Sequence, residues 1–110
     1  LKKDSTLPMM YMSDAINATL KIMTTEAKNV KIRSSYNIAG VSFSPKEISD
    51  EIQRNISEFS ITYTPDFRQK IADSWPNSID DSHAQKDWKW NAEFDLPKIT
   101  SDMLKNLTAN

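Results

Sequence analysis

A chain of 110 residues with 14 basic and 15 acidic side chains has the length of one small domain and almost no net charge. That balance excludes the basic surface expected of a protein that binds nucleic acid or an anionic membrane. The sequence has no cysteine, which excludes disulfides and a thiolate nucleophile and favours a cytoplasmic protein. No apolar run approaches the roughly 18 residues needed to span a bilayer.

The first half of the chain predicts a strand, a helix and a second strand. Leu7–Met12 is a continuous apolar run with a proline near its start, which indicates a short buried strand. Ser13 or Asp14 is expected to cap a helix that runs to about Met23. Apolar residues cover most of the girth of this helix, so it is expected to make contacts on two sides. Tyr36–Ala39 predicts a short strand, closed by a glycine.

The second half begins with the clearest local signal of the sequence. Ser44, Pro45 and Glu47 form the pattern of a capping box with proline at the first helical position, so a helix is expected there. Ile61–Thr64 is β-branched and aromatic and predicts a strand, which Pro65 stops. Three further helices are expected, over Arg68–Ala72, from Asp81 or Ser82 to about Trp88, and from Leu96 onward.

Three stretches carry a resemblance to a known family. Arg68–Trp90 reads RQKIADSWPNSIDDSHAQKDWKW, with a charged helix, an Ala-Asp-Ser-Trp-Pro turn, a doubled aspartate before the next helix and a Trp-Lys-Trp ending. This order resembles the C-terminal region of extended short-chain dehydrogenases and NAD-dependent epimerases/dehydratases, and most of all their L-threonine 3-dehydrogenase branch. Leu7–Ala15, LPMMYMSDA, and Tyr36–Pro45, YNIAGVSFSP, resemble the same branch.

The resemblance implies a mixed α/β fold for residues 1–110, with short strands and about five helices. They would form the single C-terminal, substrate-side domain of an extended Rossmann-type enzyme. It also implies that the parent enzyme oxidises L-threonine to 2-amino-3-ketobutyrate with NAD. A homodimer is expected, in the cytoplasm or, in a eukaryote, in the mitochondrion.

The chemistry-bearing motifs of that family are missing from this sequence. An NAD cradle needs several glycines, whereas Gly40 stands alone. None of the three tyrosines is followed four positions on by lysine, which is the family's catalytic pattern. We therefore expect the N-terminal NAD-binding domain to be absent from this chain. We also expect no catalytic, cofactor-binding or metal-binding residue in it, and no activity of the chain alone.

Tyr11 and Arg68 are candidates for contacting L-threonine. Tyr11 ends a strand that leads toward the substrate cleft in the resembling family; alternatively, it packs in the core with its hydroxyl bound to backbone. Arg68 matches, by its place before the turn, an arginine that grips the diphosphate in nucleotide-sugar epimerases, and its fork suits a carboxylate. The alternative for Arg68 is a structural salt bridge to Asp66, Asp73 or Asp80.

Trp75 is the third candidate substrate-binding residue. Between serine and proline in a turn, it offers a rigid face that would keep water from the reaction, or it plugs a gap between the last helices. Trp88 and Trp90 are expected in the core. Lys89 stands between them, where many relatives carry glycine in a left-handed conformation. His83, the single histidine, is expected on the surface.

Two other functions stay open. The chain could belong to a nucleotide-sugar epimerase or dehydratase, but such enzymes commonly place arginine where Leu7 stands. The absence of a basic cluster nearby favours a small substrate. A free-standing interaction module is the other alternative, and it would have to cover the two-sided apolar helix by self-association.

Overall fold

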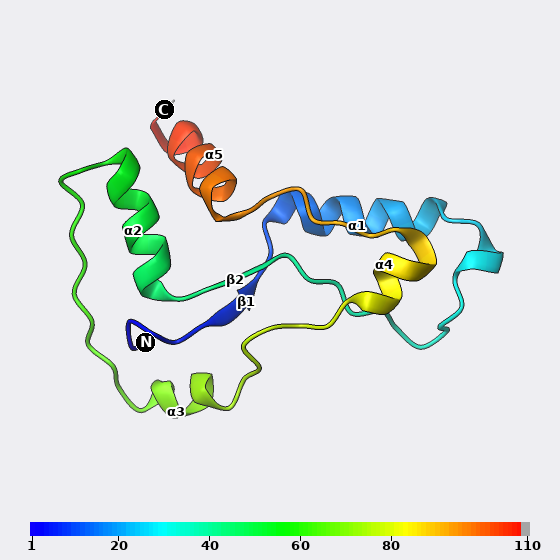
Figure 1. Ribbon diagram of the computed structural model, residues 1–110, viewed down its shortest axis with the longest axis horizontal. Helices are drawn as coiled ribbons and strands as arrows, with labels where there is room; N and C mark the ends of the chain where they lie inside the picture. The colour runs from blue at the N-terminus through cyan, green and yellow to red at the C-terminus, as the bar shows by residue number, and fades with distance from the viewer. Residues whose placement is uncertain (109–110) are drawn as a thin grey trace.

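Two short strands lie at the centre of the molecule in the computed structural model, which describes residues 1–108 (Figure 1). β1 (Leu7–Met9) and β2 (Val41–Phe43) pair antiparallel, with Leu7 opposite Phe43 and Met9 opposite Val41. β1 is shorter than the expected strand over residues 7–12, because the first helix already begins at Met12.

The strand expected over Tyr36–Ala39 is wrong, and pairing starts only at Val41. At Ala39, side chains bond to the backbone in place of a neighbouring strand. The Ala39 N–H donates to a carboxylate oxygen of Asp81 at 3.2 Å, and the Ala39 carbonyl accepts from the indole nitrogen of Trp90 at 3.2 Å. With both its groups already bonded, this backbone has no need of a ladder partner.

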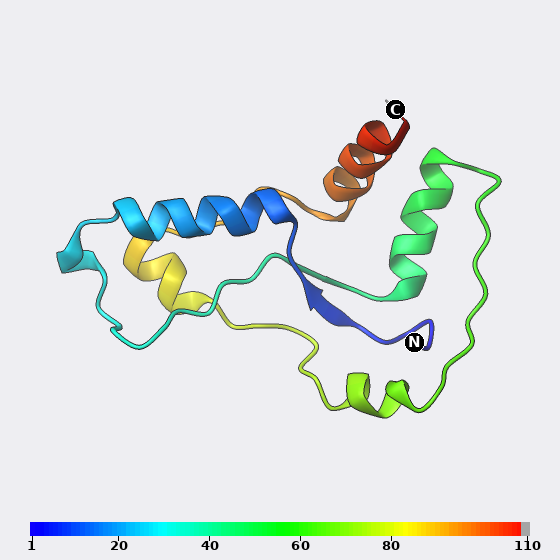
Figure 2. The same ribbon diagram turned by 180° about the vertical axis from the view of Figure 1, so that it is seen from behind.

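The strand expected over Ile61–Thr64 is also wrong. This segment belongs to a long connection that arcs around the outside of the molecule, away from both strands (Figures 1 and 2). Strand propensity reflects a fit to a half-buried pleated surface, and no strand of the described residues lies beside this segment to provide one.

The five expected helices are confirmed, and the fold is a mixed α+β arrangement of helices with two short strands. The capping box is formed, since the Glu47 N–H donates to the Ser44 hydroxyl at 3.2 Å while the Ser44 N–H donates to the Glu47 carboxylate at 3.1 Å. The helices are α1 (Met12–Thr24), α2 (Pro45–Asn55), α3 (Arg68–Asp73), α4 (Ser82–Trp88) and α5 (Leu96–Thr108), with a short 3-10 turn at Ala27–Asn29.

The expected cap of the first helix is wrong. Tyr11 occupies the N-cap position without a side-chain cap bond, and neither Ser13 nor Asp14 lies ahead of the helix. The Asp14 carboxylate instead accepts the backbone N–H groups of Glu93 and Phe94, each at 3.0 Å. It therefore joins α1 to the segment that leads into α5.

The largest apolar cluster forms where α1 meets α4. Trp88 and Trp90 are buried there with Ala18 and Ala84, as expected for the two tryptophans. Lys89 between them has the left-handed conformation (φ 57°), also as expected, which lets both neighbours face the cluster. Holding a side chain in this conformation costs roughly 1 kcal/mol relative to glycine.

The helices are spread out rather than gathered around one centre. In both views α1 and α4 lie at one end, α2 and α5 at the other, and α3 stands apart below the N-terminal segment (Figures 1 and 2). The radius of gyration is 16.7 Å. A compact domain of this length would have about 13 Å. The chain therefore leaves much helix surface without a partner of its own.

Gly40 is required by a close approach of two backbone segments. A Cβ built on it would lie 2.7 Å from the Met9 carbonyl oxygen and 3.1 Å from the Met10 Cα. Both are backbone atoms, which cannot rotate aside. We expect Gly40→Ala to lower the free energy of unfolding by about 1–3 kcal/mol, as overpacking does.

Urea denaturation measures this effect. Asn37→Ala, an exposed change in the same connection, is the matched control and is expected to cost less than about 0.5 kcal/mol. Equal stabilities of the two variants would show that the backbone at Gly40 adapts freely.

Candidate functional site

Trp75 projects from a turn that is fixed to the end of α3. Its backbone N–H donates to the Ala72 carbonyl at 3.1 Å, and that of Ser74 donates to the Ile71 carbonyl at 3.1 Å. The tryptophan side chain is nevertheless 56% exposed. Within the described residues it fills no gap between the last helices. A role as a wall of the substrate site stays a prediction.

The exposed side of α3 carries an apolar face. Phe67, Ile71 and Trp75 follow at four-residue spacing and are all exposed. Phe67 and Ile71 are four residues apart and lie on the same side of α3, while Trp75 extends from the turn after its end. Single exposed apolar residues are ordinary, but three large ones within nine residues indicate a surface that meets something.

Arg68 is engaged by a carboxylate next to it. Its guanidinium forks onto Asp66, with Nη2 at 2.6 Å from Oδ2 and Nε at 3.1 Å from both carboxylate oxygens. The salt bridge to Asp66, one of the expected alternatives, is therefore present, while Asp80 accepts the backbone N–H of Ser82 instead. The guanidinium remains mostly exposed, so binding of a substrate carboxylate stays a prediction for Arg68.

The ion pair between Arg68 and Asp66 is expected to be intact at neutral pH. Hydrogen bonds from Arg68 lower the pKa of the Asp66 carboxyl to about 2. A lowered pKa means that the interaction is complete above the ordinary carboxyl range and is lost only as pH falls toward 2. Because the pair is exposed and screened by water, it contributes little to stability.

Tyr11 lies on a different part of the molecule. Its hydroxyl donates to the Asp102 carboxylate of α5, and its ring lies 4.6 Å from that of Phe94. The hydrogen bond to Asp102 raises the pKa of the Tyr11 hydroxyl. The partner is thus a carboxylate rather than the expected backbone group. Arg68 begins α3 and Trp75 follows its end, whereas Tyr11 precedes α1, and α3 lies apart from the start of α1 (Figures 1 and 2).

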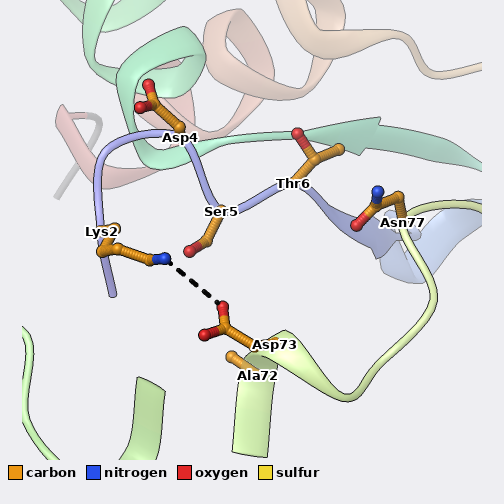
Figure 3. Close-up of a pocket in the computed structure, with 7 residues that line it drawn as sticks. All are labelled: Lys2, Asp4, Ser5, Thr6, Ala72, Asp73 and Asn77. Carbon is orange, nitrogen blue, oxygen red and sulfur yellow. Dashed lines mark ion pairs between the residues drawn. The ribbon is translucent and has the colours of Figure 1, made fainter. Parts of the chain in front are cut away.

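A polar pocket of about 210 Å³ opens beside the Trp75 turn. Figure 3 shows Lys2 reaching toward Asp73 across it, with Ser5 between them; the Lys2 ammonium is 3.8 Å from the Asp73 carboxylate. Lys2, Asp4, Ser5, Thr6, Ala72, Asp73 and Asn77 line it. Nothing in the sequence indicates that residues 2–6 lie next to α3, and Gln69, which bonds to Lys2 and Ser5, was not among the candidates.

Solved structures and curated sequences similar to this chain are known, although not every comparison finds a match. No family model matches the chain. The solved structure of the GalE-like L-threonine dehydrogenase from Cupriavidus necator, in its apo form, is 51% identical, with a TM-score of 0.93 over 97% of this chain and 38% of that one. The L-threonine dehydrogenase from Phytophthora infestans is 48% identical, with a TM-score of 0.94 over 99% of this chain and 35% of that one.

Curated sequences give the same result. The mitochondrial L-threonine 3-dehydrogenase of Bos taurus is 47% identical over 105 residues, 94% of this chain and 28% of its own length. An uncharacterized epimerase/dehydratase of Staphylococcus haemolyticus is 42% identical over 106 residues, 96% of this chain and 33% of its own length. The chain is similar to part of L-threonine dehydrogenases and to part of an epimerase/dehydratase. It spans about a third of the relatives that it matches.

Glycine occurs at one position of the chain. Gly40 packs against β1, and no glycine has a positive φ. Nor do three His, Cys, Asp or Glu side chains of residues 1–108 come together as a metal site would require. His83 is exposed, as expected. None of the described helices is long and apolar enough to cross a membrane.

Proposed function

We propose that this chain is the C-terminal, substrate-side domain of an NAD-dependent L-threonine 3-dehydrogenase, which oxidises L-threonine to 2-amino-3-ketobutyrate. The main support for this proposal is the similarity to the Cupriavidus necator L-threonine dehydrogenase, at 51% identity over 97% of the chain. The longer polypeptide, called the parent below, would supply NAD binding and the proton acceptor. No step of the hydride or proton transfer is assigned to residues of this chain, and the chain alone is expected to be inactive.

The exposed face of α1 supports a larger parent. Met12, Ile16, Leu20 and Met23 are all exposed and follow one side of the helix, while Ala18 on the other side packs in the core. The sequence predicted contacts on two sides, and only one is made here. We assign this face to the N-terminal, NAD-binding domain of the parent, because the relatives are about three times as long as this chain.

The epimerase or dehydratase alternative rests on the Staphylococcus haemolyticus relative, which is 42% identical. Leu7 makes a nucleotide-sugar substrate less favourable. Its side chain is buried against the neighbouring strand and has no charge that could bind a diphosphate. The free-standing interaction module is disfavoured by the unpartnered face of α1. A homodimer of the parent remains part of the proposal, although one 43% identical relative, from a metagenome, is described as monomeric.

An activity assay of the parent tests the proposed function. Reduction of NAD is expected with L-threonine and not with nucleotide sugars, and calorimetry of this chain alone with NAD is expected to show no binding. Turnover of a nucleotide sugar would favour the epimerase alternative, and saturable NAD binding by the chain would overturn the domain assignment. We expect the parent in the cytoplasm of a bacterium or, as for the Bos taurus relative, in the mitochondrion of a eukaryote.

Arg68 can be tested against its own ion pair. If the guanidinium binds the substrate carboxylate, Arg68→Ala in the parent raises the KM for L-threonine tenfold or more, because a charged hydrogen bond contributes about 1.5–3 kcal/mol. Asp66→Ala keeps the guanidinium and frees it, so KM is expected to stay constant or fall. Equal losses in the two variants, measured by initial rates at saturating NAD, would leave the ion pair as the function of Arg68.

A further inference from the structure

The side chain of Gln69 is the point at which α3 is attached to the N-terminal segment. Its carboxamide oxygen accepts the Lys2 backbone N–H at 2.7 Å, and its amide nitrogen donates to the Ser5 hydroxyl at 2.7 Å. The same nitrogen donates to the Asp73 carboxylate, also at 2.7 Å. Gln69 is only 9% exposed. A buried amide with all its donors used holds its partners in one geometry.

Gln69 carries the hydrogen bonds of this attachment. Among the described residues, α3 has two hydrogen bonds to distant parts of the chain, one accepted and one donated by the Gln69 side chain. The one ion pair that adds to them, Lys2 with Asp73, is long at 3.8 Å and exposed at both ends, so it contributes little. Long connections flank α3 on both sides and leave it apart from the other helices (Figures 1 and 2).

The attachment lies opposite the apolar face of α3. Gln69 and Asp73 are four residues apart and share the side that meets the N-terminal segment, whereas Phe67 and Ile71 lie on the exposed side and Trp75 follows the end of the helix. Because the Ser74 and Trp75 backbone N–H groups bond to carbonyls of α3, the tryptophan moves with the helix. Fixing the polar side therefore fixes the backbone from which the indole projects.

We propose that Gln69 is a positioning residue, which sets the place of Trp75 in the substrate site by attaching α3 to residues 2–5. This proposal rests on the proposed function for its effect on L-threonine turnover. The attachment itself does not, because it can be measured without any substrate. Gln69 touches no reacting atom in this scheme, and its loss should disturb substrate positioning more than cofactor binding.

The test exchanges hydrogen-bond donors for acceptors at Gln69 and Asp73 in the parent. Gln69→Glu keeps the shape but removes both donors and sets a carboxylate against that of Asp73. The double variant Q69E/D73N restores a donor at position 73, while the Lys2 N–H and the Ser5 hydroxyl can donate to the new carboxylate. Gln85→Glu is the matched control, since exposed Gln85 also donates to a carboxylate four residues away, that of Asp81.

Two readouts are taken, namely amide hydrogen exchange of residues 68–75 without substrate and steady-state kinetics. We expect Q69E to speed exchange about tenfold, through local opening of α3. It should also lower kcat/KM for L-threonine about tenfold or more, with the KM for NAD within twofold. Q69E/D73N should recover most of both effects, and Q85E should show neither.

Unchanged exchange in Q69E would overturn the attachment. Faster exchange with normal kcat/KM would overturn the positioning role while leaving the attachment in place. Failure of the double variant to recover would assign the loss to general damage and also contradict the proposal. If the unaltered parent does not oxidise L-threonine, the proposed function fails and the positioning role with it, whereas the exchange result still decides whether Gln69 attaches α3.

Discussion

Asp14→Ala is expected to lower the melting temperature of the parent by roughly 10 °C. Asp14 is 1% exposed, and its carboxylate accepts the backbone N–H groups of Glu93 and Phe94. Hydrogen bonds to a charged acceptor contribute about 1.5–3 kcal/mol each, and alanine leaves both N–H groups without their acceptor. The sum of about 3–6 kcal/mol gives a shift of that order, at 2–4 °C per kcal/mol in a larger protein.

A graded series separates this effect from a simple change at the start of α1. Asp14→Asn keeps one carbonyl acceptor, so about half of the loss is expected. Ser13→Ala, an exposed change at the preceding residue, should shift the melting temperature by less than about 2 °C. Equal melting temperatures of Asp14→Ala and Ser13→Ala would contradict this prediction. They would show that water replaces the carboxylate at these N–H groups, and that the contact between α1 and the segment before α5 contributes little stability.

The helices could be predicted because their signals are local. The capping box of Ser44 and Glu47 needs only four consecutive residues, and the structure forms both of its bonds. The left-handed Lys89 was likewise expected from the ending of one helix and from the resemblance. In each case the deciding partners lie within a few positions of one another in the chain.

The errors involve partners far away in the sequence. Asp14 looked like a helix cap, but its acceptor oxygens are used 79 and 80 residues further on. Ala39 looked like part of a strand, but its N–H bonds to a side chain 42 residues away. Composition and periodicity carry no information on such pairs, so a polar side chain near a helix start was assigned to the nearest amides.

The candidate site also combines a residue that local sequence pointed to and one that it did not. Trp75 stood out in the sequence because a tryptophan is unusual in a short turn, and its exposure is consistent with a role beyond packing. Gln69 carried no such signal, since a glutamine in a charged helix is ordinary and its partners lie 64 and 67 residues earlier. The resemblance supplied the function, but only the structure placed the N-terminal segment against α3.

Trp75→Ala in the parent is expected to lower kcat/KM for L-threonine about a hundredfold. Removal of the indole opens the proposed substrate site to water and loosens the substrate, and a misplacement of about 1 Å already costs on that order. The KM for NAD should stay within twofold, because NAD binding is assigned to the other domain. Trp75→Phe keeps an aromatic face and should retain activity within about tenfold of the unaltered enzyme.

Stability distinguishes a functional tryptophan from a packed one. A tryptophan buried in the parent would cost about 3–5 kcal/mol on truncation and lower the melting temperature strongly. Trp75 is 56% exposed here, so a shift of no more than a few degrees is expected. Phe67→Ala is the matched control, since Phe67 is an aromatic on the exposed side of α3. If Phe67→Ala loses as much activity, the face acts as a whole. A normal kcat/KM in Trp75→Ala beside a large drop in melting temperature would place the indole in an interdomain core and end its assignment to the substrate.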